Sequence, residues 1–251
     1  MSDFSLRIMV HLFFGALTCM DVALAVLTGV AGSVILAIAY HWHGNGVESW
    51  KARKMVHISM GTIIGLTIMR YSTISGPVLA TVIFCGFLMY VWAHDSSLIS
   101  DLLVAGSRDG ENSFGTFASG IFGLISFGLV FLLFLKEPSI LVASILAVSW
   151  GDAAGEIIGR PYGGTLIRRP FGDKSIEGAI AVFVFSILAC MTSLLLYSPA
   201  SIPDTPVPIL VIGLCISFLE FVSRRWLDNL LLPWGTALFM WIFIFPDVLL
   251  F

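Results

Sequence analysis

The sequence has little charge. Of its 251 residues only 12% are Asp, Glu, Lys or Arg, whereas 58% are hydrophobic and 20 are Phe. A soluble domain is about one quarter charged and under half apolar, so this chain has too little polar surface to cover itself in water. The composition therefore excludes an intrinsically disordered chain and predicts a protein that lies in a lipid bilayer.

Cysteine and net positive charge are scarce as well. The cysteines stand apart from one another in apolar runs, so they form neither a metal-binding CxxC motif nor a disulfide framework; they are Cys19, Cys85, Cys190 and Cys215. We expect them to be buried or lipid-facing thiols. The formal net charge of −3 disfavours a nucleic-acid partner, which needs a basic surface.

Long apolar runs recur along the whole chain. A membrane-spanning helix needs about 20 mostly apolar residues. We predict an all-α polytopic helical bundle of about seven to nine transmembrane helices, in a single integral membrane domain that covers residues 1–251. The expected spans are 4–20, 22–42, 55–69, 76–92, 114–135, 139–159, 176–197, 207–222 and 229–245, of which 4–20 is the weakest.

The basic residues predict the orientation, because loops rich in Lys and Arg stay on the cytoplasmic side. If the loop at 51–54 is cytoplasmic, alternation of the spans brings to the same side Arg108, Arg160, Arg168, Arg169, Lys174, Arg224 and Arg225. The connection 198–208 is rich in proline and has no basic residue, as expected of an outer loop. We therefore expect the charged motifs to lie on the cytoplasmic face.

Charged side chains inside the bilayer cost free energy, so their presence in a membrane protein indicates a functional site. Here they are concentrated in residues 149–178. Asp152 and Glu156 are four apart and share one face of a helix, where two carboxylates suit a cation such as Mg²⁺. Gly151, Gly155 and Gly159 recur every four residues on an adjoining stripe. Close helix packing and close approach of a substrate both account for this stripe.

The next span is expected to begin at Ser175, directly after Lys174. A helix N-terminus presents free N–H groups and a partial positive charge, which makes phosphate a candidate ligand. The alternative is an ordinary cap, in which Asp173 or Ser175 satisfies the first turn. The nearby Arg168 and Arg169 favour phosphate, because phosphate and Mg²⁺ sites bring both signs of charge together.

A further basic patch stands at the expected cytoplasmic entry of the span 55–69. It consists of Arg53, Lys54 and His57, of which Arg53 and His57 are four apart on one face. The ordinary alternatives are the positive-inside signal for the two basic residues and an interfacial or core position for the histidine. The common soluble nucleotide motifs GxxxxGK[ST] and GxGxxG are absent from the sequence, as is a kinase-type catalytic loop.

The last patch follows the span 207–222. Glu220 precedes Arg224 by one turn, and a buried ion pair between them is the alternative to a functional role. Asp228 and Asn229 open the final span, where Asp228 either caps the helix or binds a cation. We expect both patches to complete the site begun by residues 149–178.

These motifs resemble those of the CTP-dependent polyprenol kinases, the family of dolichol kinase, phytol kinase and CTP-dependent diacylglycerol kinase. GDAAGEIIG at 151–159 and KSIEGA at 174–179 resemble the signature GDxxAxxxG…KSxEG. RKMVHISMG at 53–61 resembles an RKxxHxxxG element, DNLLLP at 228–233 resembles a late DNLxxP element, and NSFGT at 112–116 is a weaker match. Three elements in the right order make the resemblance specific. It departs from the family at Ala179, where Thr is common, and at Gly155, where Ala or Ser is usual.

The resemblance implies transfer of the γ-phosphoryl group of CTP to a lipid alcohol at the cytoplasmic face, with Mg²⁺ as cofactor. The implied catalytic residues are Asp152, Lys174 and Glu177, with Asp152 or Glu177 as the base. The implied metal ligands are Asp152, Glu156 and Asp228. The implied nucleotide contacts are Arg53, Lys54, His57, Gly159, Arg160, Arg168, Lys174, Ser175, Gly178 and Asn229.

The expected partners are CTP, the bilayer and a lipid alcohol, either a polyprenol, dolichol or shorter isoprenoid such as phytol, or diacylglycerol. The oligomeric state stays open. A phosphatidate cytidylyltransferase, to which the family is distantly similar, is the first alternative. A transporter is the second and is disfavoured, because its polar groups would line both halves of the bilayer. The expected membrane is the cell membrane of a prokaryote, or the endoplasmic reticulum or plastid membrane of a eukaryote.

Overall fold

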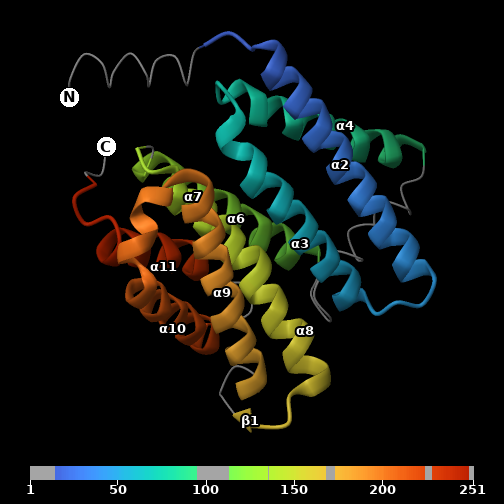
Figure 1. The fold of residues 1–251 in the computed structure, drawn as a ribbon. Coiled ribbons are helices and arrows are strands. Elements are labelled where there is room, and N and C mark those ends of the chain that lie inside the picture. The colour runs from blue at the N-terminus through green and yellow to red at the C-terminus, as the bar shows by residue number, and fades with distance from the viewer. Residues whose placement is uncertain (1–14, 95–112, 135, 168–172, 224–227, 249–251) are drawn as a thin grey trace. The chain divides into compact units, whose positions relative to one another are not determined.

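A computed structural model describes residues 15–94, 113–134, 136–167, 173–223 and 228–248. The chain divides into two compact units, Met1–Asp109 and Gly110–Phe251, and each is described by itself (Figure 1). The fold is an all-α membrane bundle, as the composition predicts. That the chain is one membrane domain stays a prediction.

Helices occupy each predicted span from residue 22 onward. Unit 1 contains α2 (Cys19–Gly44), α3 (Ser49–Thr67), the 3₁₀ turn η1 (Ile68–Arg70) and α4 (Ser75–His94). Unit 2 contains α6 (Ser113–Leu133), α7 (Pro138–Leu146), η2 (Ala147–Asp152), α8 (Ala153–Tyr162), β1 (Leu166–Ile167), β2 (Lys174–Ser175), α9 (Ile176–Tyr197), η3 (Pro199–Asp204), α10 (Pro206–Val222) and α11 (Asp228–Phe243). The expected span 4–20 lies largely outside the described residues.

Three continuous helical segments in the described ranges are long and apolar enough to cross a membrane. They are Cys19–Gly44, Pro138–Tyr162 and Ile176–Tyr197. Ser75–Val91 and Pro206–Val222 are shorter apolar segments. The segment Pro138–Tyr162 combines α7, η2 and α8, and it is the most enclosed of the three, with 78% of its apolar window buried. It carries the first signature motif, of which residues 151–154 are buried in unit 2 and residues 155–159 are partly or fully exposed.

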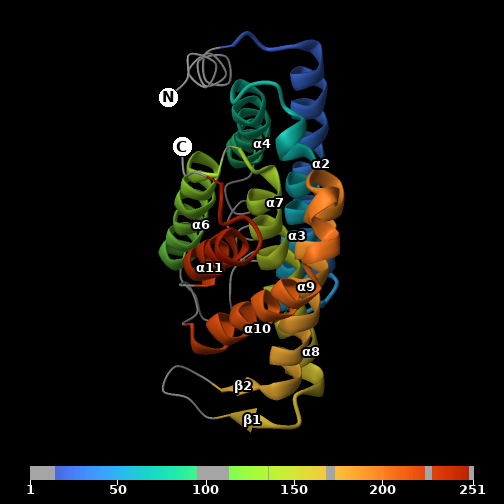
Figure 2. The same ribbon diagram turned by 60° about the vertical axis from the view of Figure 1, so that its left-hand side comes forward.

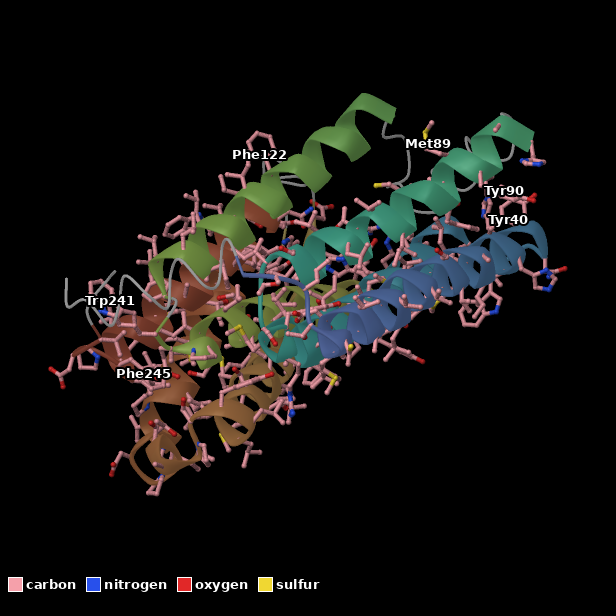
Figure 3. The ribbon with its side chains drawn as sticks, turned by 90° about the horizontal axis from the view of Figure 1, so that it is seen from above. Tyr40, Met89, Tyr90, Phe122, Trp241 and Phe245 are labelled. Carbon is pink, nitrogen blue, oxygen red and sulfur yellow. The ribbon has the colours of Figure 1, made fainter. Side chains whose placement is uncertain are left out.

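Unit 1 is organised around α2, which packs against both α3 and α4. Thr18 and Asp21 form a reciprocal capping box at the start of α2, with Asp21 N donating to Thr18 Oγ1 at 3.1 Å. The buried Asp21 carboxylate also accepts a 2.6 Å hydrogen bond from Ser72 N in the connection before α4. At the other end, Tyr40 packs on Leu36 and Val91, and Figure 3 shows it toward the same end as Tyr90.

Unit 2 is organised around α9, which packs against α7, η2, α8 and α10. Helix α11 packs against α6, α7 and α10. Figure 2 shows the short antiparallel hairpin β1–β2 where α8 ends and α9 begins, and we call this the hairpin end of unit 2. Figure 3 shows Trp241 and Phe245 at the C-terminal part of α11, where the Trp241 indole donates to the Val248 carbonyl at 2.9 Å.

The hydrogen bonds of unit 2 show that α9 runs antiparallel to the α7–α8 segment. The Glu137 carboxylate, just before α7, accepts hydrogen bonds from Ser139 and from Ser198, just after α9. At the hairpin end, Ser175 Oγ before α9 lies 3.5 Å from the Gly159 carbonyl of α8. These two consecutive segments therefore alternate in direction, as expected of neighbouring membrane spans.

The glycine stripe of α8 is a close-packing surface. A Cβ atom on any of its members would collide with α9 or with the residue that caps it; at Gly155 it would lie 2.6 Å from Val182 Cγ2. Gly178 matches the stripe from the α9 side, since a Cβ there would lie 2.8 Å from the Gly155 carbonyl oxygen. Of the two explanations for the stripe, close helix packing is confirmed.

Adding a methyl group at this contact is expected to destabilise the bundle. We predict that Gly178→Ala lowers the free energy of unfolding by about 1–3 kcal/mol, because the new Cβ meets backbone that cannot move aside. The matched control is Gly128→Ala on α6, where a Cβ meets no atom within 4 Å. Thermal unfolding in detergent measures both. Equal stability of the two variants would contradict the proposed contact.

Candidate active site

Asp152 is placed by a π-helical turn. The turn spans Ala147–Asp152 and separates α7 from α8 within one continuous helical segment. π turns are rare and are frequently found at functional sites. Asp152 is its last residue and is buried, with 8% of its surface exposed. The sequence signal for this turn is weak, because Ser149, Trp150 and Gly151 are ordinary residues of an apolar helix.

One turn after Asp152, Glu156 forms an ion pair with Arg160. The carboxylate and guanidinium are 2.8 Å apart, and the glutamate side chain is 17% exposed. This i,i+4 pair lies on the outer turn of α8, toward the hairpin end. Glu156, expected to bind a metal, and Arg160, expected to bind the nucleotide, are therefore in contact with each other in this structure.

Ser175 caps α9. Its Oγ accepts a hydrogen bond of 3.1 Å from Gly178 N, and Ile176 N donates to the Thr165 carbonyl at 3.1 Å. Two of the first three N–H groups of the helix are thus satisfied within the protein. The ordinary cap, with Ser175 rather than Asp173, is the arrangement observed, so an anion site here depends on the neighbouring basic side chains rather than on a bare helix end.

Lys174 extends from β2 to the C-terminal turn of α10. Its ammonium group contacts both the carboxylate and the main-chain carbonyl of Glu220. The lysine side chain is 23% exposed and the glutamate side chain 10% exposed. The expected partner of Glu220 was Arg224, which lies outside the described residues. Among the described residues, Lys174 is a partner of Glu220, across 46 residues of sequence.

The contacts of Lys174 continue to the start of α11. Ser223 Oγ lies 2.8 Å from the Glu220 carbonyl oxygen and also contacts the Asp228 carboxylate. Ser223 and Asp228 are both buried. Lys174, Glu220, Ser223 and Asp228 form a continuous polar chain, which we call the Lys174–Asp228 chain. It connects the KSxEG motif to the DNLxxP motif, which the sequence separates by about 50 residues.

Asp152 and Lys174 lie at different depths along the bundle. Gly155 faces Gly178 across the α8–α9 contact, Asp152 precedes Gly155 by three residues, and Lys174 precedes Gly178 by four. Because the helices are antiparallel, these offsets add, and the backbone of Asp152 is roughly 10 Å farther from the hairpin end than the backbone of Lys174, at about 1.5 Å per residue. The two charged motifs are therefore stacked along α8 and α9.

Comparison with known proteins finds two lipid kinases that are similar to this chain. The chain is 28% identical over 197 residues to the phytol kinase of Synechocystis sp., a match that covers 75% of this chain and 77% of that protein. It is 27% identical over 130 residues to the CTP-dependent diacylglycerol kinase 1 of Eremothecium gossypii, over 45% of this chain and 41% of that protein. Both relatives are lipid kinases, which supports the resemblance of this chain to the CTP-dependent polyprenol and lipid kinases. No family model and no solved structure matches it.

Three residues of the motif at 53–61 lie in unit 1, in the N-terminal half of α3. Lys54 is buried, with 1% of its surface exposed, whereas Arg53 and His57 are partly exposed. The spacing of Arg53 and His57 places them on one face, as predicted. That this patch completes the site of unit 2 stays a prediction. Arg168 lies outside the described residues, as do Arg169 and Arg225.

Glu177, expected from the resemblance to be catalytic, contacts the main chain next to the hairpin. Its Oε1 accepts a hydrogen bond of 3.2 Å from Thr165 N. Asn229, on the first turn of α11, is partly buried. Within the described residues no three His, Cys, Asp or Glu side chains gather as a metal site. The roles of these residues in binding metal or nucleotide stay predictions.

The cap of α9 yields a stability test. We predict that Ser175→Ala lowers the free energy of unfolding by about 1 kcal/mol, because Gly178 N loses its acceptor. The matched control is Ser144→Ala on α7: this buried hydroxyl donates to the Ile140 carbonyl of its own helix, so no backbone N–H loses an acceptor. Thermal unfolding in detergent compares them. An equal effect of both substitutions would contradict the cap.

Proposed function

We propose that the protein is a CTP-dependent lipid-alcohol kinase, which transfers the γ-phosphoryl group of CTP to an isoprenoid alcohol. The match to a phytol kinase over three quarters of the chain supports a kinase of this class. The name of the second relative supports CTP as the donor. The apolar helices support a membrane location, and we propose a prokaryotic cell membrane with the hairpin end toward the cytoplasm.

The stacking of Asp152 below Lys174 is the observation that carries the proposal. A nucleotide approaches from water and would meet the cations at the hairpin end first. A lipid alcohol approaches from the acyl layer and would meet the deeper carboxylate. The backbones of the two residues differ in depth by about 10 Å. CTP at Lys174 and the alcohol at Asp152 would therefore meet between them from opposite directions, as phosphoryl transfer requires.

The proposed reaction assigns a role to each charged group. The alcohol gives its proton to the Asp152 carboxylate, its oxygen bonds to the γ-phosphorus, the bond from that phosphorus to the β–γ bridging oxygen breaks, and CDP leaves. Lys174 contacts the phosphate oxygens as charge develops on them. Asp152 is proposed as the base over Glu177, because the Glu177 carboxylate accepts the Thr165 amide in the hairpin.

One buried carboxylate is chemically suited to Mg²⁺. This ion is commonly held by one or two protein carboxylates and completes its shell with water and phosphate oxygens. Asp228 is a buried oxygen donor of that kind and would hold the ion, whereas Asp152 is kept for the proton transfer. Bound Mg²⁺ would offset the charge of the β- and γ-phosphates.

Incubation with radiolabelled nucleotide and a panel of lipid alcohols tests the activity. We expect label from γ-labelled CTP in a phosphorylated isoprenoid, with CDP as the second product, a preference for CTP over ATP, and loss of activity in EDTA that Mg²⁺ restores. The panel should contain phytol, farnesol, a polyprenol and diacylglycerol. A CDP-lipid with pyrophosphate, formed from phosphatidate, would instead indicate a cytidylyltransferase and contradict the kinase.

Asp152→Asn tests the proposed base. The substitution keeps the size of a buried side chain but cannot accept the alcohol proton, so we expect kcat to fall by about 100-fold or more. The matched control is Glu137→Gln, which alters a hydrogen-bonded carboxylate at the opposite end of unit 2. Thermal unfolding confirms that both variants fold. Turnover of Asp152→Asn near that of wild type would exclude Asp152 as the base.

A further inference from the structure

Glu220 holds Lys174 through two different acceptors. The lysine ammonium contacts the Glu220 carboxylate Oε1 and the Glu220 main-chain oxygen. An ammonium group has three N–H donors and no acceptor. Two acceptors on one residue fix the direction of the ammonium group much more closely than one does, and they leave its third N–H for another partner.

The position of Glu220 in α10 explains why its main-chain oxygen accepts this contact. Helix α10 ends at Val222, so the Glu220 carbonyl is among the last four, which have no N–H partner within the helix. The partial negative charge of a helix C-terminus also favours a cation there. Ser223 Oγ, 2.8 Å from the same carbonyl oxygen, contacts Asp228 as well and thereby links this helix end to α11.

We infer that Glu220 is a positioning residue for Lys174: it fixes the ammonium group so that the third N–H meets a phosphate oxygen of the donor. The inference rests on the proposed function. Glu220 lies outside the matched motifs at 53–61, 151–179 and 228–233. Both side chains are largely buried, so the pair is weakly screened by water, and its geometry is held between β2 and α10 before any nucleotide arrives.

A purely structural ion pair would have different consequences. It would tether the hairpin to α10, and its loss would lower stability without a specific effect on the role of Lys174. A positioning residue acts only through the group that it orients. Its removal should therefore have no further effect once that group is itself absent, which a double-mutant cycle measures.

The experiment compares kcat and KM for CTP in wild type, Glu220→Gln, Lys174→Gln and the double variant. The amide keeps the size of the side chain and the main-chain contact. We expect Glu220→Gln to lower kcat by about 10- to 100-fold, the cost of a small misplacement of a catalytic group. KM for CTP should change by less than about threefold, and the double variant should match Lys174→Gln. Glu220→Asp should recover part of the loss.

Multiplicative losses of kcat in the double variant would overturn the inference, because Glu220 would then act independently of Lys174. So would a fall in thermal stability with kcat unchanged, which is the structural outcome. Glu137→Gln is the control for loss of a hydrogen-bonded carboxylate away from Lys174 and should leave kcat and KM unchanged.

Chemical modification of Lys174 separates this inference from the proposed function. An amine-reactive reagent is applied with and without tripolyphosphate, and the modified fraction of Lys174 is measured by mass spectrometry. Protection of Lys174 in wild type that is lost in Glu220→Gln supports the inference even if no lipid alcohol is phosphorylated. Equal protection in both proteins, or protection in neither, overturns it. Absence of CTP-dependent transfer in wild type would refute the proposed function alone.

Discussion

The close approach of α8 to α9 is the constraint on which the site of unit 2 depends. Side chains at Gly151, Gly155 and Gly159 would collide with α9 or with its cap, and Gly178 provides the matching bare backbone. Because the two helices are antiparallel and in contact at these glycines, the position of each residue along the bundle axis is fixed. Asp152 is then held deep in the bundle and Lys174 at its hairpin end.

The ends of three helices supply the polar groups at that level. Ser175 caps α9, and the carbonyl of Glu220 near the C-terminus of α10 accepts the ammonium of Lys174. Asp228 at the start of α11 contacts Ser223. Helix ends carry main-chain groups without partners inside their own helix. In an apolar bundle, polar side chains and charged ligands are therefore buried at the lowest free-energy cost beside the helix ends, where hydrogen-bond partners are present.

Most of the helices were predictable because a bilayer imposes a simple rule. Apolar runs of about 20 residues must become helices, since lipid offers no partner to main-chain groups. The predicted bounds of α9 agree with the structure at both ends, and those of α2, α4 and α10 agree within a few residues. The π turn at Ala147–Asp152 was not predicted, because it depends on local packing rather than on hydrophobicity.

The candidate site was predictable only in part. Order and spacing along the chain singled out Asp152, Lys174 and Asp228, because ionisable groups are rare in an apolar sequence and therefore conspicuous. The contacts between these motifs were not predictable: the ion pair of Lys174 with Glu220 joins residues 46 apart, and no local pattern in the sequence indicates it.

The sequence by itself determined that the protein is a membrane bundle, where its helices lie and which of its motifs resemble those of lipid kinases, because these follow from composition and local order. Only the tertiary structure decided that the glycine stripe is a packing surface, that Asp152 lies deeper than Lys174, and that Glu220 and Ser223 connect two motifs. These features depend on which helix faces meet, and that is set by contacts between residues far apart in the chain.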